Sequence, residues 1–188
     1  MAVRHAFTID EWHRMGEVGL FGDNARVELL DGEVIEMAPI GSRHGGCVNR
    51  LNRLLVTRLG ERAVVAPQNP VVLNDISEPQ PDIAVLAPRD DMYSSCHATP
   101  ADILLLIEVA DSSLGYDTNR KAPYYAANGV AESWVVDLDR EQILVMRSPS
   151  PSGYEQVRTM RRGDRLHIEA VVGLSFTVDD VLGPTPDS

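Results

Sequence analysis

The sequence is poor in cysteine, and this excludes two classes of small protein. Only Cys47 and Cys96 occur in 188 residues, and neither lies in a CxxC motif or a cluster of cysteine and histidine. A disulfide framework needs several paired cysteines, and a structural zinc site needs four Cys or His ligands. We therefore expect two free thiols in a reducing environment.

Long apolar runs are also missing. Residues 1–12 lack the hydrophobic segment of a signal peptide. The most apolar stretch, residues 103–110, is too short to cross a bilayer and contains Glu108. We expect a cytoplasmic protein with no membrane partner.

Positive charge is scarce. The chain has 17 Lys and Arg residues against 28 Asp and Glu residues, which gives a net charge of −11. This charge argues against a protein that holds nucleic acid by bulk electrostatics, since phosphate contacts need Lys and Arg. It does not exclude an enzyme that meets nucleic acid locally through metal ions, because carboxylates hold such ions.

What is present fits one globular domain. The chain is 44% hydrophobic and 24% charged, and 188 residues can bury a sizeable core. We expect the domain to span residues 1–183 and residues 184–188 to form a loose tail.

Two segments of the first third have helical patterns. Thr8 and Glu11 have the spacing of a capping box, which predicts a short helix to about Met15. Apolar residues recur at helical spacing across 43–59, and Ser42 is the expected N-cap.

A third helix is predicted over residues 117–128. Pro123 is allowed only near a first turn, so the helix should begin near Thr118 or Asn119. Asn128 and Gly129 form a typical C-terminal signal.

Strand patterns fill most of the remaining chain. Asp31-Gly32 predicts a hairpin between 26–30 and 33–37, and the apolar run 103–109 is typical of a strand buried on both faces. Other predicted strands are 63–66, 70–73, 82–86, 132–137, 142–147, 154–160 and 166–172, the last two paired around 161–164. This order of elements predicts a mixed sheet with helices packed on it.

Three acids stand where a fold does not need them. Asp82 opens an apolar strand, Glu108 lies late in another, and Glu28 lies among apolar residues. Buried carboxylates need partners, and Mg²⁺ is a suitable partner that binds one or two of them. Each acid alone also fits a structural role: Glu108 as an ion-pair partner, Asp82 as a turn or cap residue, Glu28 as an outward-facing strand residue.

Other polar residues can likewise be read as functional or as structural. Asp117, Lys121 and Tyr125 recur on one helical face, where Asp117 and Lys121 alone would be an ordinary surface ion pair. His44 lies on the apolar stripe of its helix, as a hydrogen-bonded core histidine or a functional one. Several arginines could flank a substrate cleft or could simply lie solvated on exposed faces. They are Arg43, Arg50, Arg53, Arg158, Arg161, Arg162 and Arg165.

The order of these short motifs is more specific than any one of them. The series runs Glu28-Leu29-Leu30-Asp31-Gly32-Glu33, Met37, His44, Gln80-Pro81-Asp82-Ile83-Ala84-Val85, Ile107-Glu108-Val109, Tyr116-Asp117, Lys121, Pro123, Tyr125, Gly129, Glu132, Trp134 and Asp137. In this order it closely resembles the Uma-two family of restriction-type endonucleases, a branch of the PD-(D/E)XK nuclease superfamily, over about residues 7–172.

The resemblance implies an α/β (α+β) fold: a restriction-endonuclease-like mixed β-sheet core flanked by helices, with extra antiparallel strands in the C-terminal part. It also implies an endonuclease that hydrolyses phosphodiester bonds of nucleic acid, with DNA as the expected substrate and Mg²⁺, or Mn²⁺ in its place, as the cofactor.

The resemblance also assigns site residues. Asp82 and Glu108 match the two metal-binding acids, and the carbonyl of Val109 is an expected third ligand. The superfamily lysine usually lies two residues after the second acid, where this chain has Ala110, and Lys121 matches a lysine shifted onto the following helix. Two further residues match recurring positions of the family near the site, namely Glu28 and His44.

Two other functions stay open at this stage. One is a non-catalytic or regulatory domain that binds nucleic acid or protein on the same fold, which the net charge favours. The other is a homodimer whose β-rich C-terminal half is the interface. The presence of Asp82, Glu108 and Lys121 together favours catalysis, since a structural domain has no need of all three.

Overall fold

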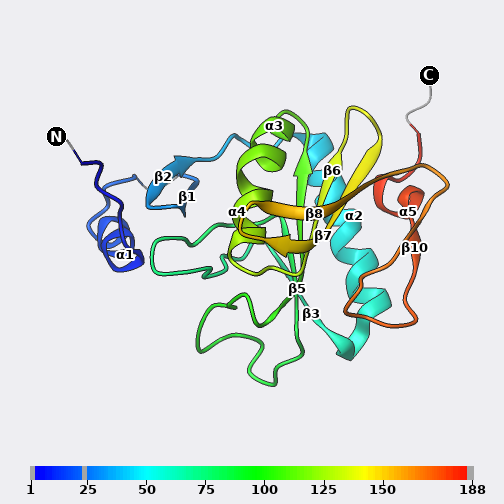
Figure 1. Cartoon of the computed structure of the whole chain (residues 1–188), viewed down its shortest axis with the longest axis horizontal. Coiled ribbons are helices and arrows are strands. Elements are labelled where there is room, and N and C mark those ends of the chain that lie inside the picture. The colour runs from blue at the N-terminus through cyan, green and yellow to red at the C-terminus, as the bar shows by residue number, and fades with distance from the viewer. Residues whose placement is uncertain (1–2, 23–24, 186–188) are drawn as a thin grey trace.

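A six-stranded mixed sheet forms the centre of the molecule (Figure 1). The computed structural model describes residues 3–22 and 25–185, and the strand order is β3-β4-β5-β6-β7-β8. The strands are β3 (Val64–Pro67), β4 (Ile83–Leu86), β5 (Ile103–Ala110), β6 (Glu132–Asp137), β7 (Gln142–Ser150) and β8 (Gly153–Arg161). Within this sheet β5 and β6 are parallel, and the other neighbouring pairs are antiparallel. The predicted mixed sheet flanked by helices is confirmed.

Helices cover both faces of the sheet. Ile107 on β5 packs in one core cluster with Leu51 and Leu55 of α2 (Ser42–Leu59), whereas Leu106 packs in a second cluster with Tyr125 of α4 (Ala122–Ala127). Because side chains alternate along a strand, Glu108 lies on the same face as Leu106. The acid of β5 therefore projects toward the helix that follows this strand.

The crossover between β5 and β6 is one continuous helical segment. It consists of α3 (Leu114–Tyr116), a π-helical turn η2 (Asp117–Lys121) and α4. Parallel neighbours need such a crossover because a tight turn cannot join them. The predicted start near Thr118 or Asn119 is wrong, because a widened turn precedes Pro123 and lets helical geometry begin earlier.

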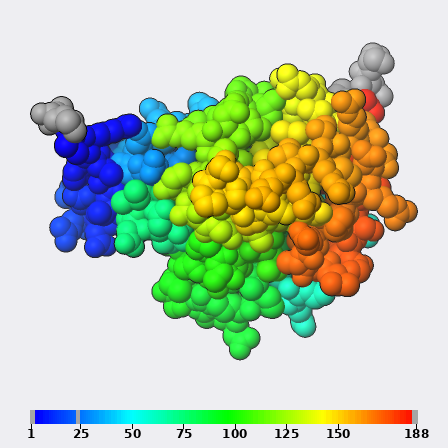
Figure 2. Space-filling model, viewed as in Figure 1, coloured from blue at the N-terminus to red at the C-terminus, as the bar shows by residue number. Residues whose placement is uncertain are grey.

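The N-terminal elements form one end of the molecule (Figures 1 and 2). They are α1 (Ile9–Glu17) and the hairpin of β1 (Val27–Leu30) and β2 (Glu33–Glu36). The capping box of Thr8 and Glu11 and the turn at Asp31-Gly32 are both confirmed. The hairpin is attached to the loop before β4, since the N–H of Glu78 donates to the carbonyl of Leu29 over 2.9 Å.

The C-terminal elements lie at the opposite end (Figure 1). These are β9 (Arg165–Leu166), β10 (Phe176–Thr177) and α5 (Val178–Leu182), while the short 3₁₀ turn η1 (Gly60–Arg62) ends α2. Phe176 meets Trp134 of β6 edge to face, with ring centroids 5.8 Å apart, so this end packs onto the α2 side of the sheet.

Some predicted elements differ from the structure. Residues 70–73 form no strand and contain one isolated bridge, Val71 to Ala98, and the N-cap of α2 is Gly41 instead of Ser42. Strand β8 pairs with β7 across a tight turn, not with residues 166–172. An alternating pattern identifies a strand but not its partner, and the turn after Ser150 decides the pairing. Part of the predicted tail, residues 186–188, lies outside the described residues.

Across residues 3–22 and 25–185, we find no helix that is long and apolar enough to pass through a lipid bilayer.

Candidate active site

One pocket of about 420 Å³ gathers the residues that the sequence singled out. We call it the active-site pocket. It lies where the hairpin, the start of α2, the beginning of β4 and the end of β5 meet the π-helical turn. Its lining includes all the predicted site residues, namely Glu28, His44, Asp82, Glu108, Val109 and Lys121.

Asp82 is held by groups from two neighbouring elements. Its Oδ2 accepts the N–H of Val109 over 2.8 Å and lies 3.0 Å from Nε2 of His44 on α2. The Asp82 carboxylate raises the pKa of His44, although partial burial of the ring opposes this. Oδ1 of Asp82 forms no hydrogen bond to the described residues, so it remains available to a ligand.

The backbone of Val109 also faces this corner. In an extended strand the N–H and C=O of one residue point to the same side, so the Val109 carbonyl is directed toward the chain that leads into β4. Continuing the β4–β5 register beyond Ile83↔Ile107 places Pro81 opposite Val109. A proline has no N–H to donate. The Pro-Asp dipeptide thus supplies a carboxylate and leaves a strand carbonyl without its usual donor.

Lys121 joins two carboxylates in the floor of the pocket. Its Nζ lies 3.0 Å from Oε1 of Glu108 and 3.1 Å from Oε2 of Glu28, and all three side chains are buried. Tyr125, one turn further along the helix, donates its hydroxyl to Oε1 of Glu108 over 2.5 Å. The N–H of Gln80 donates to Glu28 over 3.1 Å. Lys121 and Tyr125 therefore fix one oxygen of Glu108 and leave Oε2 without a partner among the described residues.

The electrostatics of this floor follow from its burial. Removal from water raises the pKa of Glu108 to about 8, the carboxylates of Asp117, Asp82 and Glu28 act in the same direction, and Lys121 opposes them. Desolvation also disfavours the charged form of Lys121, but Glu108 and Glu28 outweigh it and raise the pKa of the ammonium. The pocket therefore has more acids than cations, and an added cation would favour the ionised form of Glu108.

Asp117 is not the surface partner of Lys121. Both residues are buried, and the Asp117 carboxylate accepts the hydroxyl of Ser113 over 2.5 Å. Burial raises the pKa of Asp117. In a π-helical turn residue i+4 no longer lies directly above residue i, so the i, i+4 pair expected for a regular helix does not form. π-helical turns of this kind occur frequently at functional sites.

The sequence did not predict how the loop before β4 is held. The side-chain amide of Gln80 donates to the carbonyl of Gln68, and the N–H of Gln68 donates to the carbonyl of Asp82 over 3.0 Å. Gln68 has a φ of 53°, which is unusual for a residue other than glycine. The position of Gln80 directly before Pro81-Asp82 was the one available signal, whereas nothing in the sequence indicates Gln68.

The predicted arginines are divided between two regions. Arg43 lies beside the pocket but is shared between Asp111 at 2.9 Å and Asp139 at 3.1 Å. Three others are exposed on β8 and β9: Arg158, Arg161 and Arg165. Arg50, Arg53 and Arg162 line a separate groove on the other side of α2. Of the predicted arginines only Arg43 lies beside the active-site pocket; Arg26 lines it and donates to the carbonyl of Ala38 over 3.1 Å.

The donor set suits a hard cation held by few protein groups. Among the described residues no group of three or more His, Cys, Asp or Glu side chains is arranged to hold a metal, so a closed site of the zinc type is absent there. Mg²⁺ instead binds through one or two carboxylates and keeps several waters. Asp82, Glu108 and the Val109 carbonyl together meet that requirement.

Comparison with known proteins identifies the family of the chain. The sequence profile of the Uma2 family, described as "Putative restriction endonuclease", matches residues 9–179. The chain belongs to this family. Membership in the Uma2 family confirms the resemblance seen in the ordered motifs.

Solved structures support the same fold. A protein described as "a putative nuclease belonging to DUF820", from Anabaena variabilis ATCC 29413, superposes with a TM-score of 0.73. The alignment covers 94% of this chain and 97% of the other at 14% sequence identity, so the likeness concerns the fold. No curated protein matches the sequence.

Proposed function

We propose that this Uma2 protein is a metal-dependent endonuclease that hydrolyses phosphodiester bonds of nucleic acid, with DNA as the substrate. One observation supports this most directly. Asp82 and Glu108 line the same pocket next to a buried ammonium, and each has one oxygen without a partner among the described residues. Family membership supports the reaction class, and the metal and substrate are our inference.

The chain's own groups would hold the cofactor. Oδ1 of Asp82, Oε2 of Glu108 and the Val109 carbonyl would bind Mg²⁺, or Mn²⁺ in its place. The bound cation would lower the pKa of a water molecule and neutralise charge on the phosphate. His44 fixes the orientation of the Asp82 carboxylate through its contact with Oδ2. The ring therefore acts as a positioning group for the metal-binding acid.

Lys121 would act on the reacting phosphate. An ammonium has three donors, and the contacts with Glu108 and Glu28 use two of them. The third can orient the attacking water or donate to a phosphate oxygen as negative charge develops. Glu28 holds Nζ in place, so its contribution is the position of Lys121.

A second function keeps some support from the charge. With a net charge of −11, the molecule as a whole repels nucleic acid, which favours a non-catalytic binding or regulatory domain on the same fold. A homodimer through the C-terminal half is compatible with either function and stays a prediction. Catalysis and metal binding distinguish the two functions.

The decisive test compares wild type with Asp82→Ala, Asp82→Asn and a control, Glu36→Gln. Glu36 is exposed on the rim of the same pocket, so its substitution removes one negative charge without touching the proposed ligands. Mg²⁺ and Mn²⁺ are titrated calorimetrically, and plasmid and single-stranded DNA are then offered. We expect wild type and Glu36→Gln to bind metal and cleave, and both Asp82 variants to lose about 100-fold or more in rate.

Each outcome has a defined meaning. Cleavage by Asp82→Asn at the wild-type rate would contradict the assignment of the site. Metal binding without cleavage of either DNA would refute the proposed substrate. Absence of metal binding in wild type, with nucleic acid present, would favour the non-catalytic domain. Thermal unfolding of each variant verifies that the fold is intact.

A further inference from the structure

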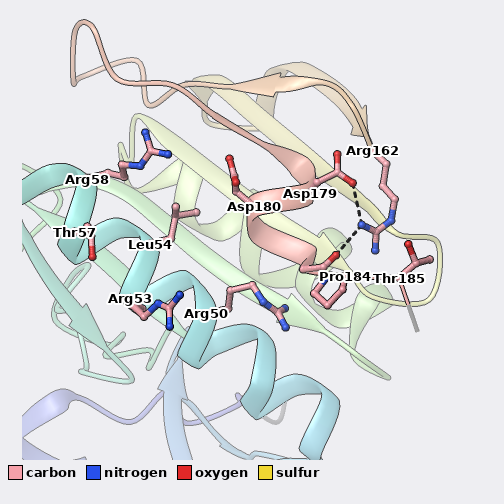
Figure 3. A pocket seen from close by; sticks show the side chains of 11 residues that line it. Arg50, Arg53, Leu54, Thr57, Arg58, Arg162, Asp179, Asp180, Pro184 and Thr185 are labelled. Atoms are coloured by element: carbon pink, nitrogen blue, oxygen red, sulfur yellow. Dashed lines mark hydrogen bonds and ion pairs between the residues drawn. The ribbon is translucent and has the colours of Figure 1, made fainter. Parts of the chain in front are cut away.

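A second concave surface lies between α2 and α5 (Figure 3). Its volume is about 570 Å³, and we call it the arginine groove. Arg50, Arg53 and Arg58 project from α2, and Arg162 closes the groove beside α5. No contact described above for the active-site pocket involves these four side chains.

One acid of the groove is paired with a cation, and the other caps a helix. Arg162 pairs with Asp179 at 3.0 Å and with Glu141 at 2.6 Å. The Asp180 carboxylate accepts the N–H of Thr177 over 2.8 Å as part of the capping box of α5. These pairs neutralise Arg162 but leave the charges that project from α2.

Those charges outnumber the one acid of the groove, Asp180, that has no cationic partner among the described residues. Arg50, Arg53 and Arg58 form no ion pair with any residue of 3–22 or 25–185. In a protein of net charge −11, three such guanidinium groups on one helix produce a local positive potential against the overall field. The groove is therefore an anion-attracting surface on an acidic molecule.

Arg50 is held in place by neutral groups. One of its nitrogens donates to the carbonyls of Leu182 over 2.6 Å and Val181 over 3.4 Å. Gly183 has a φ of 78°, and a Cβ at that position would overlap the guanidinium of Arg50. Carbonyls and glycine fix the side chain without cancelling its charge. Its Nε and second terminal nitrogen have no hydrogen-bond partner among the described residues.

The three arginines of α2 form a row whose length fits several successive phosphates of one nucleic-acid strand. At a rise of about 1.5 Å per helical residue, Arg50, Arg53 and Arg58 lie roughly 9, 14 and 21 Å along α2 from His44. One strand of a duplex carries a phosphate about every 3.4 Å of axis. A small anion would need one or two of these cations, whereas the row spans about four phosphates and begins two turns from the active-site pocket.

We propose that the arginine groove binds the sugar-phosphate backbone of the nucleic-acid substrate beside its site of cleavage. This inference rests on the proposed function for the identity of the ligand. The groove would supply the phosphate contacts that the acidic surroundings of the active-site pocket do not provide. Such contacts position the strand and carry no sequence information.

The test measures binding without catalysis. Fluorescence anisotropy follows a labelled duplex and a single strand of random sequence in EDTA, over a series of salt concentrations. The variant is Arg53→Gln with Arg58→Gln, since both side chains are exposed and Arg50 is left to fasten α5. The control is Arg158→Gln with Arg165→Gln, which removes the same charge from two other exposed arginines.

We expect the groove variant to bind at least about tenfold more weakly at low salt. The slope of log K against log salt should fall by about 1.4 to 1.8, which corresponds to two lost phosphate contacts. The control should keep the wild-type slope, and the double lysine variant at 53 and 58 should regain it. With a cleavable substrate, the groove variant should raise KM and leave kcat unchanged.

The outcomes separate this inference from the proposed function. An unchanged slope in the groove variant, an equal loss in the control, or no binding by wild type at low salt would each overturn the groove assignment. If the wild type cleaves and the groove variant has a normal KM, the groove assignment is also overturned, but the proposed nuclease function stands. The expected binding pattern in a protein that cleaves nothing would instead support the groove and refute the catalytic role.

Discussion

Glu108 is the residue on which the charge of the active-site pocket depends. It lies on a strand that is buried on both faces, and its one fixed oxygen accepts from both Lys121 and Tyr125. Burial raises its pKa to about 8, against an ordinary value near 4.5. Between about pH 4.5 and pH 8, the Glu108 carboxyl therefore keeps its proton in the folded state and has lost it in the unfolded state.

This raised pKa predicts a pH-dependent stability. A group whose pKa is higher in the folded state contributes least when both states are ionised, so Glu108 should lower the free energy of unfolding as the pH rises from about 4.5 to about 8. Glu108→Gln keeps the shape and does not titrate. In EDTA, the variant should gain on the order of 2–4 kcal/mol relative to wild type between pH 5 and pH 8.

Urea unfolding at several pH values measures this difference. Glu36→Gln is the control, because Glu36 is exposed on the pocket rim and should show a difference that hardly changes with pH. A constant difference between Glu108→Gln and wild type would show that the folded carboxyl has an ordinary pKa.

At the residue scale the sequence predicted identities better than contacts. Asp82, Glu108 and Glu28 could be singled out because carboxylates beside apolar residues are costly unless partnered. Lys121 was singled out as a site residue only by the resemblance to the family. Their partners could not be derived in the same way. The hydrogen bond from Gln80 to Gln68 depends on a left-handed backbone at Gln68. No local sequence pattern predicts that conformation for a residue other than glycine.

The hairpin of β1 and β2 is the element that brings Glu28 into the pocket. Its turn is fastened on both sides: the N–H of Gly32 donates to Ile76 over 2.8 Å, and its carbonyl accepts from Phe7 over 3.0 Å. Gly32 has a φ of 69°, and a Cβ there would lie 2.5 Å from the Cβ of Ala6. The turn therefore needs glycine for both its conformation and its close packing.

Two glycine variants separate these requirements. Gly163 also has a positive φ, 88°, but a Cβ there would meet nothing within 4 Å. Gly163→Ala should cost about 1 kcal/mol from conformation alone, whereas Gly32→Ala should cost about 2–4 kcal/mol because overlap is added. Urea unfolding gives both values, and equal losses would argue against the packing of the hairpin on the N-terminal segment.

At the element scale local signals succeeded and distant pairing failed. The capping box at Thr8 and the turn at Asp31-Gly32 fix elements through neighbouring residues, so they could be predicted. The partner of β8 and the one bridge in 70–73 depend on which strands meet in space. The π-helical turn before Pro123 likewise departs from the regular periodicity on which the prediction of a start near residue 118 relied.

The molecule as a whole is held together without cross-links. Cys47 projects from α2 into the core and Cys96 is exposed, and burial raises the pKa of the Cys47 thiol to about 11. We expect one thiol to react quickly with an aromatic disulfide reagent in the native protein and the second to react only in denaturant. Cys96→Ser should abolish the fast phase. A lower unfolding midpoint in reductant would instead reveal a disulfide.

Across the whole molecule, negative and positive side chains gather in different places. The active-site pocket is acidic, whereas the arginine groove on the other side of α2 carries cations that the described acids do not neutralise. Separation of the two along one helix would reconcile a net charge of −11 with the polyanionic substrate that we propose. Composition could reveal the total charge but not this arrangement, since it depends on the packing of α5 against α2.

Lys121 is the sole lysine of the sequence, and it is almost completely buried. The surface of residues 3–22 and 25–185 therefore offers no side-chain amine to an acylating reagent, and the one ε-amine is closed off between two carboxylates. Acylation at this position would require the ammonium to lose its proton and leave Glu28 and Glu108, which raise its pKa. The rate at which a small amine-reactive ester modifies Lys121 would thus report how often the lysine leaves its two carboxylates, and mass spectrometry of the peptide that contains Lys121 would measure it.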